Sequence, residues 1–259
     1  FPMGAAIWSS PMLKMRDFPA EPYLHFLENH GLLRLINPPQ WYTVKGGSHS
    51  YVKAIVKTLK REPKTGADIQ KILRPNNAPA EIHYSSGDSE QYDHIVIATH
   101  ADTALKLLGD ADSSETSRLS PWVYQDNRVI LHTDVNFMPP KQSLWASWNF
   151  LRKPNEASEK KASPVSVSYY MNRLQGLKTK TPYIVTLNPQ KSIDPNKIIN
   201  STVLTHPLYS FNALNTQKIL KEKNGLRNTW FCGSYFGYGF HEDAVLSSVQ
   251  LAKAFDLQL

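Results

Sequence analysis

The sequence predicts a mixed α/β fold, of the α+β kind, with more than one sheet. Three segments carry this prediction, and they are residues 93–99, 165–170 and 229–255. The first is β-branched and nearly continuous in apolar character, which is typical of a buried strand. The second alternates Val with Ser before two Tyr residues, as a half-buried strand does. The third reads as a strand, a glycine-rich turn and a helix whose N-terminus faces the turn.

The remaining elements are predicted from apolar spacing, β-branched runs and turn residues. Helices are expected at 21–29, 51–59, 101–108, 211–221 and 241–255. Strands are expected at 68–73, 80–84, 93–99, 129–133, 165–170, 183–187 and 229–232. Gly31 is expected to end the first helix, and Ser48 to cap the second. An exposed loop is expected at 152–163, while 188–200 is polar and irregular.

The composition is that of an ordinary globular chain, with 41% apolar and 20% charged residues in 259. Lys and Arg number 29 and Asp and Glu 22, which gives a net charge of +7. The basic residues are scattered, so no nucleic-acid partner is predicted. No apolar run approaches the ~20 residues that span a bilayer, and no secretory leader is visible, so no integral membrane span is expected. The single cysteine, Cys232, excludes an intrachain disulfide and favours a cytoplasmic location.

Histidine and acidic residues do not form a common metal pattern. His241, Glu242 and Asp243 are adjacent at a helix start and point in different directions. His94 and His100 are six residues apart, which matches no usual ligand spacing. No metal site is therefore predicted.

The turn and helix after residue 232 are suited to a flavin. Unpaired amides and aligned dipoles at a helix N-terminus attract negative charge. A reduced flavin carries negative charge at its N1–C2=O edge, so a helix aimed there would promote hydride acceptance. Gly237 and Gly239 would let the backbone approach a flat ring closely.

This unit, residues 229–255, resembles the closing motif of the FAD-dependent amine oxidase and phytoene desaturase superfamily. There, a strand ends in a small residue and Gly before a loop and a helix. The whole chain is similar to one branch, the bacterial predicted NAD/FAD-binding proteins, which are related to a region fused to plant cyclopropane fatty acid synthases. The stretches that carry the resemblance are FPMGAAIWS (1–9), NHGLL (29–33), VKGGS (44–48), LHTD (131–134), WASWN (145–149) and YMNRLQ (170–175).

The resemblance implies FAD as the cofactor and gives positions for its adenine and linker parts. The backbone of Ile69 would contact the adenine end. Gly233 and Ser234 would lie by the ribityl and diphosphate chain. The family often has an acid where this chain has Ser234, which removes one hydrogen bond.

The resemblance also implies contacts at the flavin ring. Gly239 would lie close to the ring, and Asp243 and Ala244 would cap its pyrimidine edge. His132 falls near the position where some amine oxidases place a Lys that faces flavin N5 through water, so it is the candidate catalytic residue. The alternative is a buried, hydrogen-bonded histidine on a strand.

Two domains are expected from the resemblance. Residues 1–60 and 115–205 would form a substrate-binding domain with a mixed sheet. Residues 61–114 and 206–259 would form the C-terminal part of an FAD-binding domain whose sheet is incomplete. The sequence lacks the G-x-G-x-x-G that cradles the diphosphate, so a missing N-terminal Rossmann segment is the expected partner.

The function that follows is FAD-dependent hydride transfer from a C–N or C–C bond of a small-molecule or lipid-linked substrate. The alternative is a truncated, non-catalytic module that does not bind FAD by itself. In either case the sheet face left without its partner predicts an apolar patch and poor solubility of these 259 residues alone.

Overall fold

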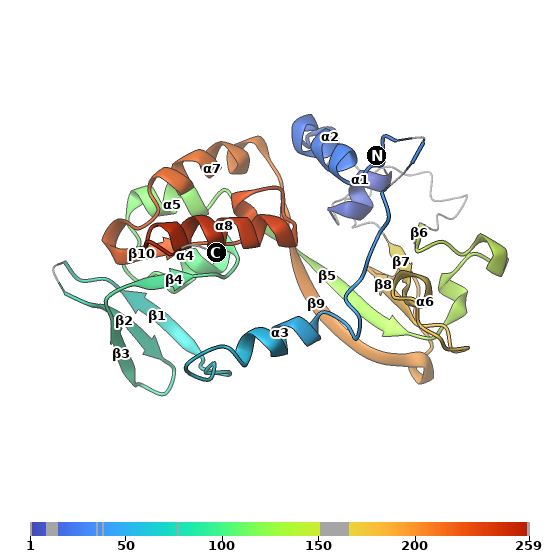
Figure 1. The fold of residues 1–259 in the computed structure, drawn as a ribbon, viewed down its shortest axis with the longest axis horizontal. Coiled ribbons are helices and arrows are strands. Elements are labelled where there is room, and N and C mark those ends of the chain that lie inside the picture. Colours follow the sequence, from blue (N-terminus) through green and yellow to red (C-terminus); the bar gives the residue numbers. More distant parts are fainter. Residues whose placement is uncertain are drawn as a thin grey trace. The chain divides into compact units, whose positions relative to one another are not determined.

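A computed structural model describes residues 2–8, 15–34, 36–37, 39–76, 78–150 and 166–257 (Figure 1). The α-helices are α1 (Pro2–Ile7), α2 (Ala20–Asn29), α3 (His49–Val56), α4 (Ala101–Leu107), α5 (Ser113–Leu119), α6 (Met171–Leu174), α7 (Phe211–Glu222) and α8 (His241–Lys253). Short 3-10 helices are η2 (Val135–Phe137), η3 (Gln142–Leu144), η4 (Pro195–Lys197), η5 (Leu226–Asn228) and η6 (Ser234–Phe236).

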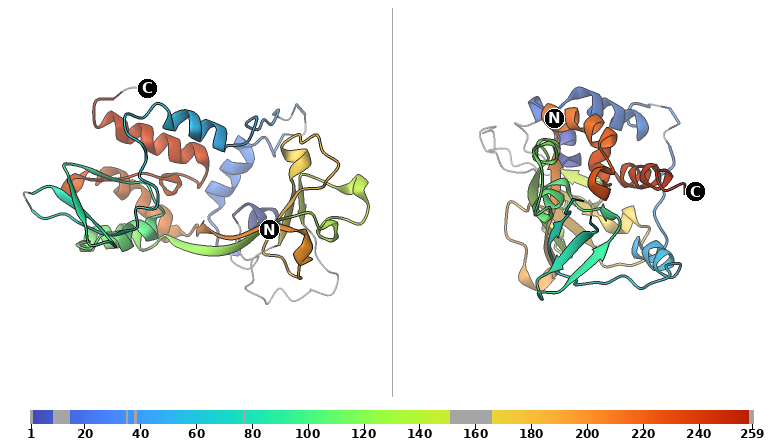
Figure 2. Two further views of the ribbon diagram at one scale, coloured as in Figure 1. Left: turned by 90° about the horizontal axis from the view of Figure 1, so that it is seen from below. Right: turned by 90° about the vertical axis from the view of Figure 1, so that its left-hand side faces the viewer.

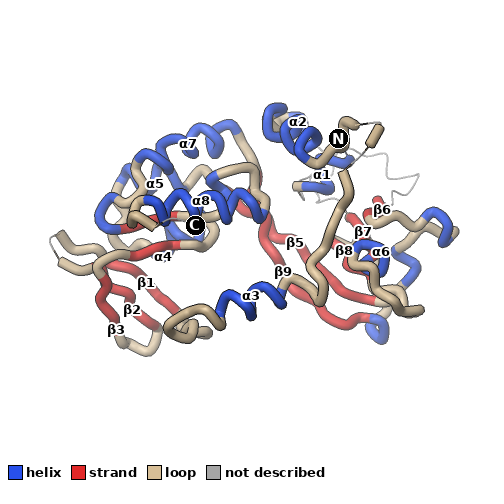
Figure 3. The backbone as a smooth tube through the Cα atoms, viewed as in Figure 1, coloured by secondary structure: helices blue, strands red, loops and turns tan. Residues whose placement is uncertain are grey.

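The strands of the described residues belong to three sheets, and helices and strands alternate along much of that sequence (Figure 3). They are β1 (Ile69–Leu73), β2 (Ala80–Tyr84), β3 (Ser89–Tyr92), β4 (Ile95–Ile97), β5 (Val123–His132), β6 (Trp148–Phe150), β7 (Val167–Tyr170), β8 (Ile184–Leu187), β9 (Ile198–Leu208) and β10 (Thr229–Phe231). The predicted mixed α/β fold is confirmed.

The chain divides into two compact units. Unit 1 contains residues 1–18, 23–63 and 125–206, and unit 2 contains residues 19–22, 64–124 and 207–259. Residues 115–124, which the sequence assigned to the substrate side, lie in unit 2 because α5 packs against α4 and α7. The roles assigned to the two domains stay predictions.

Unit 2 holds two small sheets. Strands β1, β2 and β3 form an antiparallel meander (Figure 2, teal), and β4 pairs with β10 in parallel. A single bridge between Ile72 and Leu108 connects β1 to the end of α4. In β4 the side chains of Ile95 and Ile97 are buried whereas Val96 is exposed, so one face of this pair lies in the core.

Unit 1 is built on a five-stranded sheet in the order β6-β7-β8-β5-β9. Val167 of β7 packs with Ala5, Ala6 and Met15, so α1 lies against this sheet. Gly4 leaves room for the Met15 and Tyr23 side chains, whose ends a Cβ at this position would overlap.

Some elements differ from their prediction for physical reasons. Ser48 makes no side-chain cap bond because its own backbone is already helical. Strand β9 begins at Ile198, inside the stretch expected to be irregular, because pairing in the sheet outweighs its polar composition. The loop expected at 152–163 lies outside the described residues.

Candidate functional site

The best-defined site in unit 2 is the turn between β10 and α8. Strand β10 ends at Phe231, and Gly233 turns the chain into η6. The N–H of Gly233 donates to Ser247 Oγ at 2.9 Å, which fixes the strand end beneath α8. Ser234 O then accepts from the N–H groups of Gly237 and Gly239, at 3.1 and 3.2 Å. The turn is therefore closed on itself before the helix begins.

The start of α8 offers amide donors. Its first internal hydrogen bond runs from Ala244 N to Phe240 O at 3.2 Å. The N–H groups of residues 241–243 precede that bond, so they are the ones a helix leaves without internal partners. The Asp243 carboxylate turns back and accepts from Phe240 N at 2.9 Å. The amides without an internal helical partner are therefore those of residues 241–243, a range that includes Asp243 of the predicted pair but not Ala244.

Two side chains hold the turn, the half-buried Gln217 and the buried Tyr209. Gln217 on α7 donates to the carbonyl oxygens of Tyr235 and Gly237, at 3.0 and 2.6 Å. The Tyr209 hydroxyl donates to Gly237 O at 3.3 Å. Burial, followed by the nearby Asp243 carboxylate, raises the pKa of Tyr209 well above its usual value, so it remains a neutral donor.

Glycine is required at two points of the turn. A Cβ on Gly237 would overlap the Asp243 carboxylate, and a Cβ on Gly239 would meet the Tyr209 hydroxyl at 2.7 Å. Gly239 also has a φ of 95°, which a side chain would strain. Packing against Asp243 and Tyr209 therefore accounts for both glycines, and the approach of Gly239 to a ring stays a prediction.

Ile69 lies apart from this turn, at the first position of β1. Its side chain is exposed, and β1 pairs with β2 on one side. On its other side β1 contacts the end of α4, through the Leu108 bridge and the bond from Gly109 N to Ile72 O, and it pairs there with no other strand of the described residues. The backbone of Ile69 is placed on a largely open strand edge, where its predicted contact stays a prediction.

His132 lies in unit 1, at the end of β5, and its side chain is fully buried. Nδ1 accepts from Asp134 N–H at 3.1 Å, so the ring proton is on Nε2, which donates to Thr186 Oγ1 at 2.7 Å. Thr186 bonds Ser168 Oγ at 2.8 Å in turn. These contacts fill both ring nitrogens, and the catalytic role of His132 stays a prediction.

The buried His132 makes stability depend on pH. Burial lowers its pKa below the ordinary value of 6.5, and the Asp134 carboxylate opposes this only in part. The pKa of His132 is lower in the folded protein than in the unfolded chain. Its contribution to the free energy of unfolding is therefore complete above about pH 6.5 and is lost as the pH falls toward the folded pKa. Relative to His132→Gln, the wild-type unfolding free energy should fall by up to ~1.4 kcal/mol per pH unit in that window.

Urea titrations of both proteins between pH 7.5 and 5 check this prediction. The other histidines are common to both, so the difference between the two curves isolates His132. If the unfolding free energies of the two proteins change in parallel with pH, the pKa of His132 is the same in the folded protein as in the unfolded chain.

A buried ion cluster lies elsewhere in unit 2. Arg74 donates to Asp110 from Nε and Nη2, at 2.9 and 2.8 Å, and to Glu115 from Nη1 at 2.5 Å. Arg227 adds a bond from Nη2 to Asp110 Oδ2 at 2.7 Å. Partial burial alone would raise the pKa of Asp110, but the bonds from Arg74 outweigh it and hold that pKa below its usual value.

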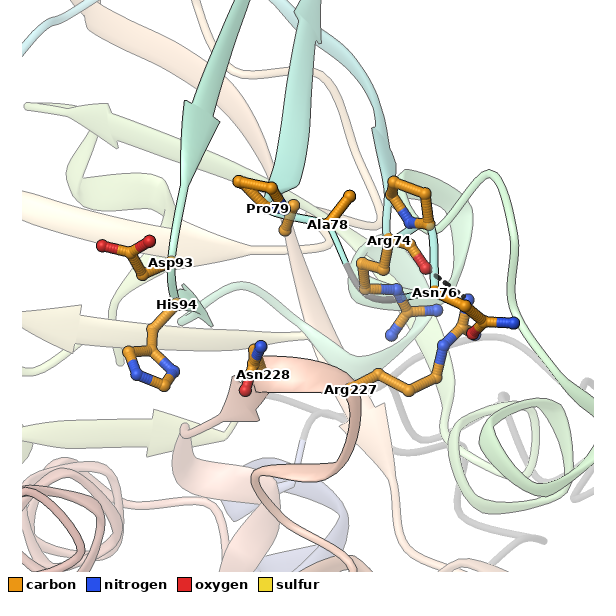
Figure 4. Close-up of a pocket in the computed structure, with 10 residues that line it drawn as sticks. Arg74, Asn76, Ala78, Pro79, Asp93, His94, Arg227 and Asn228 are labelled. Carbon is orange, nitrogen blue, oxygen red and sulfur yellow. Dashed lines mark hydrogen bonds between the residues drawn. The ribbon is translucent and has the colours of Figure 1, made fainter.

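A pocket of about 560 Å³ opens beside this cluster (Figure 4). Arg74 and Arg227 lie on one side of it, and Asp93 and His94 on the other. It adjoins the residues just before β4 and β10, so it lies at the amino ends of these parallel strands. Ligands of open α/β sheets bind at the opposite, carboxyl ends. The guanidinium groups are already paired, and the pocket is not the place where the predicted cofactor residues gather.

The sequence predicted no metal site and no membrane span, and the described residues allow a comparison. No group of three or more His, Cys, Asp or Glu side chains there is arranged to hold a metal ion. His94 packs against Phe255, and His100 stacks on Tyr124. No helix in those residues is long and apolar enough to cross a bilayer.

The chain combines a mixed α/β fold with a strand, a glycine-containing turn and a helix at residues 229–253. Residues 15–254 match the family model of the flavin containing amine oxidoreductases, and the chain belongs to that family. No curated protein matches the sequence.

Two solved structures share the fold. One is the crystal structure of a CLA-producing fatty acid isomerase from P. acnes, with 18% identity and a TM-score of 0.59. The other is reduced UDP-galactopyranose mutase, with 14% identity and a TM-score of 0.55. Each alignment covers 82% of this chain and 52% of the neighbour. The chain thus spans about half the length of these structural neighbours.

Proposed function

We propose that this chain supplies the flavin-ring side of the FAD site of an oxidoreductase. The observation that carries the proposal is the start of α8, where the amides of residues 241–243 precede the first helical bond, at 244. The turn before it is bare at Gly237 and Gly239 and is fixed from below by Tyr209 and Gln217. Backbone donors at a helix start suit the electron-rich N1–C2=O edge of a flavin.

The residues fit one part of the cofactor only. Amide donors and bare glycine backbone are suited to the ring, while the sequence contains no G-x-G-x-x-G to cradle a diphosphate. FAD binding therefore needs a second polypeptide segment that carries this loop. In the absence of that segment the chain would be a non-catalytic module, which is the second candidate function.

The chemistry proposed is hydride removal from a C–N or C–C bond. A bound flavin would accept the hydride, and the amides at 241–243 would stabilise the negative charge that develops at the pyrimidine edge. The protein's own contribution would be to orient the ring, on a turn whose residues Tyr235 and Phe236 are buried in the core.

Unit 1 is the proposed substrate side, and it carries aromatic side chains on one sheet face. Trp148 of β6 and Tyr169 of β7 are paired across the strands and pack edge to face, with ring centroids 5.7 Å apart. Trp148 and Phe150 are each more than one-third exposed, although Val167 and Tyr169 on the same face pack with the cluster that holds α1. Such a face is suited to an apolar or lipid-linked substrate.

Flavin content tests the proposed function. The complete gene product that contains this chain should be purified without added cofactor and scanned for flavin absorbance. Gly237→Ala should reduce the bound flavin at least about tenfold, which corresponds to about 1.4 kcal/mol, because its Cβ displaces the Asp243 carboxylate from its cap. Lys253→Ala, at the far end of α8, is the matched control. A wild-type protein that shows no flavin bands and takes up no added FAD would refute the oxidoreductase proposal.

A further inference from the structure

Helix α3, in unit 1, carries an apolar stripe that the described residues leave uncovered (Figure 1). None of the residues of this helix is buried. Val52, Ile55 and Leu59 recur at helical spacing in α3 and the turn after it, and they are 42%, 56% and 50% exposed. A surface helix of a globular protein normally turns such a stripe toward the core. Among the described residues, the stripe of α3 therefore has no partner.

Lysine side chains lie next to this stripe on the same helix. Successive residues of an α-helix are about 100° apart, so Lys53 and Lys57 share one side, which adjoins the apolar side. Lys60 and Arg61 follow the helix directly. No carboxylate of the described residues pairs with any of these four side chains. The apolar side consists of Tyr51, Val52, Ile55, Val56 and Leu59.

The sequence around α3 is basic over a longer stretch. Between Glu28 and Glu62 the chain contains no Asp or Glu, but it contains six basic residues. These are Arg34, Lys45, Lys53, Lys57, Lys60 and Arg61. Because no acid of this stretch offsets their charge, the surface of α3 is complementary to a negatively charged partner.

The combination of the two sides indicates which negatively charged partner fits. A nucleic acid would use the lysines and would leave the apolar stripe in water. A helix at the surface of an anionic bilayer uses both. Its apolar side chains enter the boundary of the acyl chains, and its lysines reach the phosphates of the headgroups. The arrangement of α3 therefore favours a lipid surface.

We propose that α3 and the turn after it dock the protein peripherally on an anionic lipid bilayer. Ile55 and Leu59 enter the acyl boundary, and Lys53, Lys57 and Lys60 bind headgroup phosphates. This inference goes beyond the proposed function and does not depend on it, since α3 contributes none of the proposed flavin contacts. An enzyme held in this way would meet a lipid-linked substrate at the surface where that substrate resides.

Vesicle flotation tests this inference with the complete gene product that contains this chain. One set of vesicles consists of phosphatidylcholine, and the other of equal parts of phosphatidylcholine and phosphatidylglycerol. The protein should float with the anionic vesicles and not with the neutral ones. It should be released at about 1 M NaCl, where screening reduces the range of charge interactions to about 3 Å.

Two variants separate the contributions of the two sides. The triple change of Lys53, Lys57 and Lys60 to Gln removes the charge, and the double change of Ile55 and Leu59 to Ser removes the apolar contact. Each should weaken binding to the anionic vesicles at least about tenfold. Neither should change the melting temperature, because all five side chains are exposed.

The matched control removes the same charge from another helix. Lys218, Lys221 and Lys223, on α7 and at its end, are also exposed. Their triple change to Gln lowers the net charge by the same amount as the α3 triple variant. It should leave vesicle binding unchanged, because the inference concerns the position of the charge and not its total.

Several results would overturn the inference. They are equal flotation with both kinds of vesicle, no flotation with either, and α3 variants that bind as the α7 control does. A lower melting temperature of the Ile55 and Leu59 variant would show that another segment of the gene product covers the stripe, and it would overturn the inference as well. Binding of single-stranded RNA through the three lysines, without vesicle binding, would identify a nucleic-acid partner instead.

Failure of this inference is distinct from failure of the proposed function. A protein without flavin that floats with anionic vesicles through α3 would remove the FAD function and keep the lipid surface. A protein that contains flavin but does not float with anionic vesicles would do the opposite.

Discussion

Arg74→Met is expected to lower the free energy of unfolding by about 3–5 kcal/mol. The Arg74 and Glu115 side chains are only 2% and 3% exposed, at 2.5 Å from each other. Removing the guanidinium leaves the Glu115 charge buried without its main partner, and it also removes two bonds to Asp110. Because the Glu115 carboxylate is nearly inaccessible to water, the loss should far exceed that of a surface pair.

Urea denaturation at pH 7 measures this effect. Lys106→Met is the matched control, since Lys106 pairs with Asp102 on an exposed helix face and should cost less than about 0.5 kcal/mol. Adding Glu115→Gln to Arg74→Met should recover part of the loss by removing the unpaired charge. Equal losses for Arg74→Met and Lys106→Met would show that the cluster is not buried in solution.

The ion cluster also makes the free energy of unfolding depend on pH in the acidic range. The pKa of Asp110 is depressed below its ordinary value of 3.8 in the fold. The contribution of Asp110 to the free energy of unfolding is therefore present above about pH 3.8, and it is lost as the pH falls through the pKa of the folded state. The wild type should lose stability in that range faster than Arg74→Met, which no longer has the interaction to lose.

The sequence predicted elements whose signals are local. Strand β4 was found from a β-branched run and α8 from its apolar spacing after a glycine-rich turn, and both lie within two residues of their predicted bounds. Here backbone preference and burial agree, so neighbours in sequence suffice.

The ion cluster and the contacts of His132 were not predictable in this way. Arg74 meets Asp110 and Glu115 across 36 and 41 residues, and His132 meets Thr186 across 54. One Arg among many scattered basic residues gives no sign of which carboxylates it will meet. Such pairings are fixed by the packing of sheets and helices, which periodicity does not encode.

Trp122→Ala should have the second large effect, a loss of about 3–5 kcal/mol in the free energy of unfolding. Trp122 is 1% exposed and packs edge to face on Tyr209 and Tyr235, with centroids 5.6 and 5.7 Å away. Its Nε1 donates to Thr216 Oγ1 at 3.0 Å. The cavity left behind would lie under the residues that hold the turn before α8, so local order should fall together with global stability.

Hydrogen exchange and urea denaturation separate these two consequences. Thr216→Val removes the acceptor and keeps the ring, so it should cost only about 1–3 kcal/mol and leave the amides of α8 protected. Trp122→Ala should instead raise exchange at the start of α8 by more than its global loss explains, because Tyr209 and Tyr235 lose their support. If hydrogen exchange at the start of α8 rises no more than in the rest of the protein, the turn is held by its own hydrogen bonds. The aromatic side chains of Trp122, Tyr209 and Tyr235 would then contribute to global stability alone.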